Sequence, residues 1–141
     1  MGDVVLNLTA DENARQILIL LTDYLEDQTK IGEYMDRLAT EYVVAQNLEE
    51  LQTGRYVRWI KDGVLFRGGI VVQAGKPAEA VVEATDGDSM DDIVMCKTTS
   101  NVLMQFHFNE CPCFQKLNLF EQWYLLNGSQ EKDPTVKRKH A

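Results

Sequence analysis

The spacing of the apolar residues changes near Thr53, and this change constrains the fold more than any other feature of the chain. Before Thr53, apolar residues recur every three or four positions, as they do along one face of a helix. After it, apolar and polar residues alternate, which is the pattern of a half-buried strand. A chain of 141 residues has the length of one domain with a small appendage. The sequence therefore predicts an α+β protein with its helices first.

Residues 1–52 are predicted to form an acidic helical hairpin. The stretch "TADE" that begins at Thr9 is a capping box, in which Thr9 and Glu12 satisfy each other's free amides at the start of a helix. A second helix is expected from about Lys30 to about Leu51, because apolar residues there keep the helical spacing. The hairpin carries eleven acidic and three basic residues, so its exposed surface is expected to be negative.

Residues 53–127 are predicted to form an SH3-like small β-barrel. Asp62-Gly63 is a strong signal for a two-residue hairpin turn, because type I′ geometry needs positive φ. Gly68-Gly69 lies inside the return strand, where glycine marks a bulge or a bend. Five short strands with tight turns favour a small barrel or a strongly curved sheet. These strands are Arg55–Lys61, Val64–Val72, Ala78–Thr85, Ile93–Thr98 and Val102–Phe108.

Alternation assigns each residue of the predicted hairpin to a face of the sheet. In its first strand, Val57 and Trp59 share the inward face, and Arg58 lies between Tyr56 and Ile60 on the outward face. In the return strand, one apolar face is expected to hold Val64, Phe66, Ile70 and Val72. Farther along, the segment Leu117–Leu126 fits both a short helix and a final strand, so the pattern leaves both open.

The distribution of charge limits the classes of partner. The net charge of −8 argues against a general attraction to nucleic acid or anionic membranes. Residues 128–141 carry two acidic and four basic residues and are predicted to be a flexible basic tail. The longest apolar run is five residues, Ile17–Leu21, so no membrane span is expected. The odd number of cysteines, three, and the lack of a signal peptide predict that the protein is located in a reducing compartment, namely the cytoplasm, or in a virion.

Two resemblances add to this interpretation. The stretch "GRYVRWIK…VLFRGG" resembles the opening hairpin of SH3-like and Tudor-like small barrels. The helical lead, then "YVRWI", "GGIVV" and a strand-rich end, resembles small proteins of nucleocytoplasmic large DNA viruses, some of which are minor virion or capsid components. The resemblance covers about residues 51–126. It implies a non-enzymatic assembly role and transfers no functional residue.

The sequence predicts a non-catalytic protein for protein–protein interaction or structural assembly, including assembly into a viral capsid as a minor component. Protein partners or self-assembly are expected, with no catalytic residue and no cofactor. The alternative is a small barrel that binds nucleic acid, because stacking aromatics beside cations are how such barrels hold single strands. The candidate interaction residues are Tyr56, Arg58, Ile60 and Arg67 in the sheet, and Tyr34, Met35 and Tyr42 in the second helix.

A zinc site at Cys96, His107, Cys111 and Cys113 is a further hypothesis, because these residue types suit tetrahedral zinc. The expected pairing of two strands places Cys96 opposite Met104, and His107 is then about 10 Å away at about 3.3 Å per residue. That distance is too long for the two residues to share an ion. The favoured interpretation is that the three cysteines are ordinary semi-buried thiols, and metal binding stays open. The loop "DGDSMDD" is expected to be a solvated acidic loop.

Overall fold

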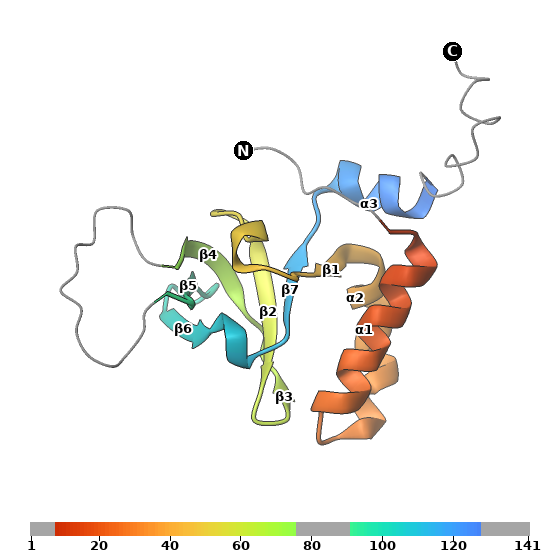
Figure 1. The fold of residues 1–141 in the computed structure, drawn as a ribbon, viewed down its shortest axis with the longest axis horizontal. Coiled ribbons are helices and arrows are strands. Elements are labelled where there is room, and N and C mark those ends of the chain that lie inside the picture. The colour runs from red at the N-terminus through yellow and green to blue at the C-terminus, as the bar shows by residue number, and fades with distance from the viewer. Residues whose placement is uncertain (1–7, 76–90, 128–141) are drawn as a thin grey trace, which may run out of the picture.

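The computed structural model describes residues 8–75 and 91–127, and it shows three α-helices and one antiparallel sheet (Figure 1). The helices are α1 (Ala10–Tyr24), α2 (Ile31–Glu41) and α3 (Leu119–Asn127). The strands are β1 (Tyr42–Val44), β2 (Tyr56–Lys61), β3 (Val64–Leu65), β4 (Gly69–Ala74), β5 (Ile93–Lys97), β6 (Leu103–His107) and β7 (Cys113–Lys116). Short 3₁₀ turns lie at Gln28–Lys30, Leu48–Glu50 and Phe108–Glu110. The predicted α+β class is confirmed.

The sheet is open across the residues described. Its strand order is β1-β7-β2-β4-β5-β6, and β3 pairs with β2 outside this path. The strands β1 and β6 form the two edges and do not pair with each other, so a closed SH3-like barrel is not confirmed. The predicted strand at residues 78–85 lies outside the described residues, as do most of the acidic loop and the basic tail.

The first predicted helix is confirmed together with its cap. The Thr9 amide donates to the Glu12 carboxylate at 2.9 Å, and the Glu12 amide donates to the Thr9 hydroxyl at 3.1 Å. Behind this cap, α1 buries Ile17 and Leu21 in the same cluster as Leu38 of α2. The two helices therefore form the predicted hairpin, and they lie together along one side of the sheet (Figure 1).

The predicted second helix is too long. It ends at Glu41, and the next three residues form β1, which pairs with β7 through Tyr42↔Lys116 and Val44↔Phe114. Two adjacent β-branched valines favour a strand here. The hydrogen bonds offered by β7 decide the outcome, and this partner is about seventy residues away along the chain. Helical spacing alone could not exclude a strand that starts one residue after a helix.

The turn and the bend of the hairpin are confirmed. Asp62 and Gly63 have φ of 53° and 78°, as a type I′ turn requires. Gly68 has φ of 83°, and a Cβ there would lie 1.8 Å from the Val57 carbonyl oxygen, so only glycine fits. The pairing changes from Ile60↔Leu65 to Val57↔Gly69, which inserts one extra residue into the return strand.

This bulge corrects the predicted faces of the return strand. The extra residue reverses the alternation, so Val71 is buried, whereas Ile70 and Val72 are 46% and 45% exposed. Val64 is also exposed, because it sits at the hairpin tip, and only Phe66 keeps the predicted inward orientation by stacking on Trp59. The apolar face that was expected to hold Val64, Phe66, Ile70 and Val72 is therefore wrong.

The two faces of β2 enter two different apolar clusters. On one face, Val57 and Trp59 are buried as predicted, and the Trp59 ring stacks on Phe106 with 4.2 Å between ring centroids. On the other face, the helical hairpin packs over Ile60 and Phe114. The expectation that Ile60 faces outward is wrong, because the helices cover it and leave it only 2% exposed.

The C-terminal half of the described residues contains the predicted pair of strands and a short helix. The strands β5 and β6 are confirmed, and Cys96 lies opposite Met104 as expected. The ambiguous segment Leu117–Leu126 is mainly helical, because α3 occupies Leu119–Asn127. Among the described residues, no helix is long and apolar enough to cross a membrane.

Candidate binding site: a basic groove beside α2

Four cationic side chains surround a hollow of about 310 Å³ at the border between α2 and the sheet. They come from α2, β2, β7 and the bend before β4, and two tyrosines complete the wall. We call this hollow the basic pocket. Its lining residues are Arg37, Tyr42, Tyr56, Arg58, Arg67 and Lys116.

Strand pairing places most of these residues. Tyr42 on β1 lies opposite Lys116 on β7, so the two side chains leave the sheet on the same face. Tyr56 and Arg58 are two residues apart on β2 and share that face. The Tyr56 hydroxyl donates to the Gly68 carbonyl at 3.4 Å, which ties it to the bend that follows Arg67.

Arg58 is held in position by two contacts. Its Nε donates to the Phe66 carbonyl oxygen at 2.9 Å. Its guanidinium lies over the ring of Tyr34 on α2, with 5.7 Å between the guanidinium carbon and the ring centroid. Neither of these two contacts is to a carboxylate, so neither neutralises the positive charge of Arg58. Tyr34 therefore acts as a support for Arg58 and does not line the pocket.

One carboxylate partly balances the pocket. Glu41 accepts from Arg37 Nε at 3.2 Å and lies 3.7 Å from Lys116 Nζ. Burial raises the pKa of the Tyr42 hydroxyl, so this group stays protonated at neutral pH and can donate a hydrogen bond. Four cations, one neighbouring carboxylate and the Tyr42 hydroxyl make an environment suited to an anion.

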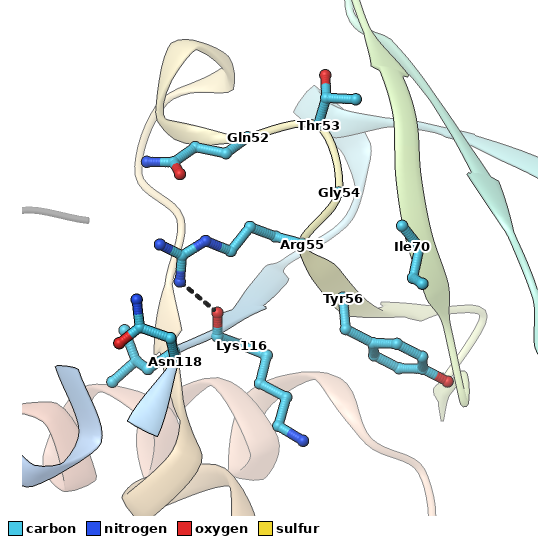
Figure 2. Close-up of a pocket in the computed structure, with 9 residues that line it drawn as sticks. Gln52, Thr53, Gly54, Arg55, Tyr56, Ile70, Lys116 and Asn118 are labelled. Carbon is cyan, nitrogen blue, oxygen red and sulfur yellow. Dashed lines mark hydrogen bonds between the residues drawn. The ribbon is translucent and has the colours of Figure 1, made fainter. Parts of the chain in front are cut away.

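A second hollow, of about 530 Å³, shares two lining residues with the basic pocket, Tyr56 and Lys116. We call it the Gln52 pocket, and the two together the basic groove. Figure 2 shows the Gln52 pocket. It is lined by Gln52, Thr53, Gly54, Arg55, Tyr56, Ile70, Lys116, Leu117 and Asn118.

Arg55 contributes little free positive charge to the Gln52 pocket. Its Nη1 donates to the Lys116 carbonyl oxygen at 3.1 Å (Figure 2). Its Nη2 donates to the Glu121 carboxylate at 2.9 Å, and this carboxylate is almost fully buried. The positive potential of the groove is therefore concentrated at the basic pocket.

The structure brings together four of the seven predicted interaction residues. Tyr42, Tyr56, Arg58 and Arg67 line the basic pocket, and Tyr34 contacts Arg58. The other two, Met35 and Ile60, pack in the cluster between the helices and the sheet. Arg37 and Lys116 were not among the predicted residues, because no local sequence pattern shows that β7 pairs with β1 and brings Lys116 close to α2.

The residues of the hypothetical zinc site lie in other environments. Cys96, Cys111 and Cys113 are buried, and burial raises the pKa of the Cys96 thiol to about 12. The Nδ1 atom of His107 pairs instead with the Asp92 carboxylate at 2.8 Å. Across residues 8–75 and 91–127, no cluster of three histidine, cysteine or acidic side chains could hold a metal ion.

No protein family, curated protein or solved structure matches this chain. The resemblances to SH3-like barrels and to small viral proteins therefore stay predictions, as do the virion role and the reducing compartment. The function proposed below is inferred from the geometry of the groove.

Proposed function

We propose that this protein is a non-catalytic binding protein that holds an acidic segment of a partner protein in the basic groove. One observation carries the proposal. Four cationic side chains converge on one hollow in a chain whose net charge is −8. Arginine binds carboxylates through short, charge-assisted hydrogen bonds, and three of the four cations are arginines.

The shape of the groove supports an extended ligand. The basic pocket supplies charge at one end, and the Gln52 pocket supplies the amide of Gln52 and the hydroxyl of Thr53 at the other. Ile70 adds an apolar wall. An extended peptide presents carboxylates, backbone amides and small apolar groups within a few residues, so it can match all three parts.

The chemistry of the basic pocket supports binding of an anion. Its six lining residues are four cations and two tyrosines, which can hold and orient an anion through charge and hydrogen bonds. A protein with this property fits the predicted role in assembly, because partner chains can be joined through their acidic segments.

Nucleic acid is the second candidate, because the same arginines suit phosphate groups and tyrosine rings can stack on bases. The burial of Tyr42, which is 5% exposed, favours the acidic peptide, because a covered ring offers little surface on which a base can stack. Glu41 and the negative helical hairpin repel both ligands alike. Both candidates use the same residues and can be compared directly.

The test is a titration of the full chain with two fluorescent ligands of matched charge, a glutamate-rich peptide and a single-stranded oligonucleotide. We expect peptide binding that weakens with salt and is lost in Arg67→Glu, which reverses an exposed charge of the pocket. Arg15→Glu on α1 makes the same change outside the groove and should keep binding. Tighter binding of the oligonucleotide would favour the second candidate, and no binding of either at low salt would reject both.

A further inference from the structure

The basic pocket keeps more positive charge than one carboxylate ligand can neutralise. Arg37 and Lys116 share the single carboxylate of Glu41. Arg58 contacts a backbone carbonyl and a tyrosine ring, so neither of its partners is charged. In the part of the chain that the structure describes, no carboxylate forms an ion pair with Arg67. Four positive charges against one negative charge leave an excess of three around one hollow.

The four cations reach this hollow from four different elements of the fold. They are Arg37 on α2, Arg58 on β2, Arg67 in the bend before β4, and Lys116 on β7. Donors that converge from several directions match a tetrahedral group with three free oxygens better than a planar carboxylate with two. The hollow of about 310 Å³ is near the lower limit for ligand pockets, so it suits one compact group.

Arg58 is oriented before a ligand binds. The Phe66 carbonyl accepts from its Nε, and the Tyr34 ring supports its guanidinium, so the two Nη groups are the donors that a ligand can use. A guanidinium held by two contacts loses little conformational entropy on binding. Arginine in this state can form the two parallel hydrogen bonds of an arginine–phosphate pair.

The charge of the ligand distinguishes between the possible anions. A phosphate group on a side chain carries about −1.5 to −2 at neutral pH. A carboxylate carries one charge, and so does each phosphate of a nucleic acid backbone. An excess of three positive charges at one point therefore favours the phosphorylated side chain. The Gln52 pocket, which shares Tyr56 and Lys116, offers contacts to the residues beside this group, and a free phosphate ion has no such residues.

We propose that the basic pocket binds a phosphorylated side chain within the acidic segment of the partner protein. The proposal rests on the proposed function, because it names the chemical group that the basic groove recognises. Arginine clusters are a recurring means of recognising phosphorylated motifs. Phosphorylation of the partner then controls the association, because an unmodified serine or threonine brings no charge to the pocket.

Fluorescence anisotropy of the full chain with three labelled peptides tests the proposal. The peptides share one glutamate-rich sequence and differ at two adjacent positions, which hold phosphoserine-alanine, glutamate-glutamate or serine-alanine. The first two peptides have nearly the same total charge. We expect the phosphoserine peptide to bind at least about tenfold more tightly than the other two, the gain of one charge-assisted hydrogen bond.

The same titrations separate failure of this proposal from failure of the proposed function. Equal affinity for the phosphoserine and glutamate peptides would overturn the phosphate assignment and leave the acidic-segment function intact. No binding of any peptide at low salt would reject both. Competition with inorganic phosphate tests the source of the group. Inorganic phosphate that binds as tightly as the phosphoserine peptide would assign the pocket to a free ion and overturn the proposal.

Variants of the pocket charges give a second measurement. Glu41→Gln removes the carboxylate that competes for Arg37 and Lys116, so the phosphoserine peptide should bind about two- to fivefold more tightly. Asp23→Asn removes an equal charge from α1 outside the pocket and should leave the affinity nearly unchanged. Arg67→Gln should weaken the phosphoserine peptide more than the glutamate peptide. Weaker binding in Glu41→Gln, or equal losses for both peptides in Arg67→Gln, would overturn the proposal.

Discussion

Two arginines three residues apart, Arg55 just before β2 and Arg58 within it, have opposite roles. Just before the strand, Arg55 is bound by the buried Glu121 carboxylate, and the pair fastens α3 to the sheet. Within the strand, Arg58 bonds a backbone carbonyl and faces the basic pocket. The comparison shows that burial and the choice of acceptor decide the role. A carboxylate from the same chain makes arginine structural, whereas a carbonyl leaves its charge available to a ligand.

Removing the Glu121 carboxylate, which pairs with Arg55, should have the largest effect on stability. Glu121→Gln leaves Arg55 buried without its counter-ion, so we expect the free energy of unfolding to fall by about 3–5 kcal/mol. Chemical denaturation measures the change. The double variant Arg55→Met/Glu121→Leu should recover much of the loss, because an apolar pair needs no counter-ion. A loss below about 1 kcal/mol in Glu121→Gln would contradict the assignment of this pair as an anchor.

Disturbing the bend at Gly68 should weaken the basic pocket around Arg58 and leave the Arg55–Glu121 pair intact. Gly68→Ala forces a side chain into positive φ, which costs about 1–3 kcal/mol, and places it against the Val57 carbonyl. We therefore expect a clear fall in melting temperature together with weaker binding of the acidic peptide.

Gly32→Ala is the matched control for this bend. A Cβ at Gly32 meets nothing within 4 Å on α2, so this variant should be stabilised by up to about 1 kcal/mol. Equal melting temperatures for Gly68→Ala and the native chain would show that the bend tolerates a side chain.

Replacing Arg58 tests whether this residue contributes more to peptide binding than to stability. Arg58→Met keeps an apolar stem but loses the hydrogen bond to Phe66 and the contact with Tyr34, so we expect a loss of about 1–2 kcal/mol and loss of peptide binding. Tyr34→Leu removes the supporting ring only, and it should weaken peptide binding less than Arg58→Met. Isothermal titration measures binding, and unchanged affinity in Arg58→Met would exclude Arg58 from the site.

The smallest expected effect concerns a third, partly exposed pair. The hydrogen bond from His107 holds the pKa of Asp92 below its ordinary value of 3.8. A lowered pKa in the folded state adds stability that is complete above 3.8 and is lost as the pH falls through the folded-state value. We expect Asp92→Asn to cost less than about 1 kcal/mol at neutral pH and nothing in strong acid. A larger cost in acid than at neutral pH would reverse the sign of this argument.

Local chemistry was predictable from the sequence. The Thr9 cap, the Asp62-Gly63 turn and the pairing of Cys96 with Met104 each depend on residues within a few positions or on one tight turn. These features need no knowledge of distant partners, and the structure confirms all three.

Distant contacts were not predictable. The strand at Tyr42–Val44 exists because β7 pairs with it, and the covering of Ile60 depends on where the helical hairpin packs. The basic pocket was found in part, because Arg58 and Arg67 lie in one recognisable hairpin. Arg37 and Lys116 reach it only through the assembled sheet.

The position of β7 between β1 and β2 sets an order of events during synthesis (Figure 1). A ribosome releases β1 and β2 long before Cys113–Lys116, so the gap between them can be filled only after β7 has emerged. Until then, neither strand has its central neighbour, and each presents an unsatisfied edge that invites pairing with other chains. Closure over a long sequence separation also slows folding. The nascent chain is therefore prone to pair with other chains until β7 is inserted between β1 and β2.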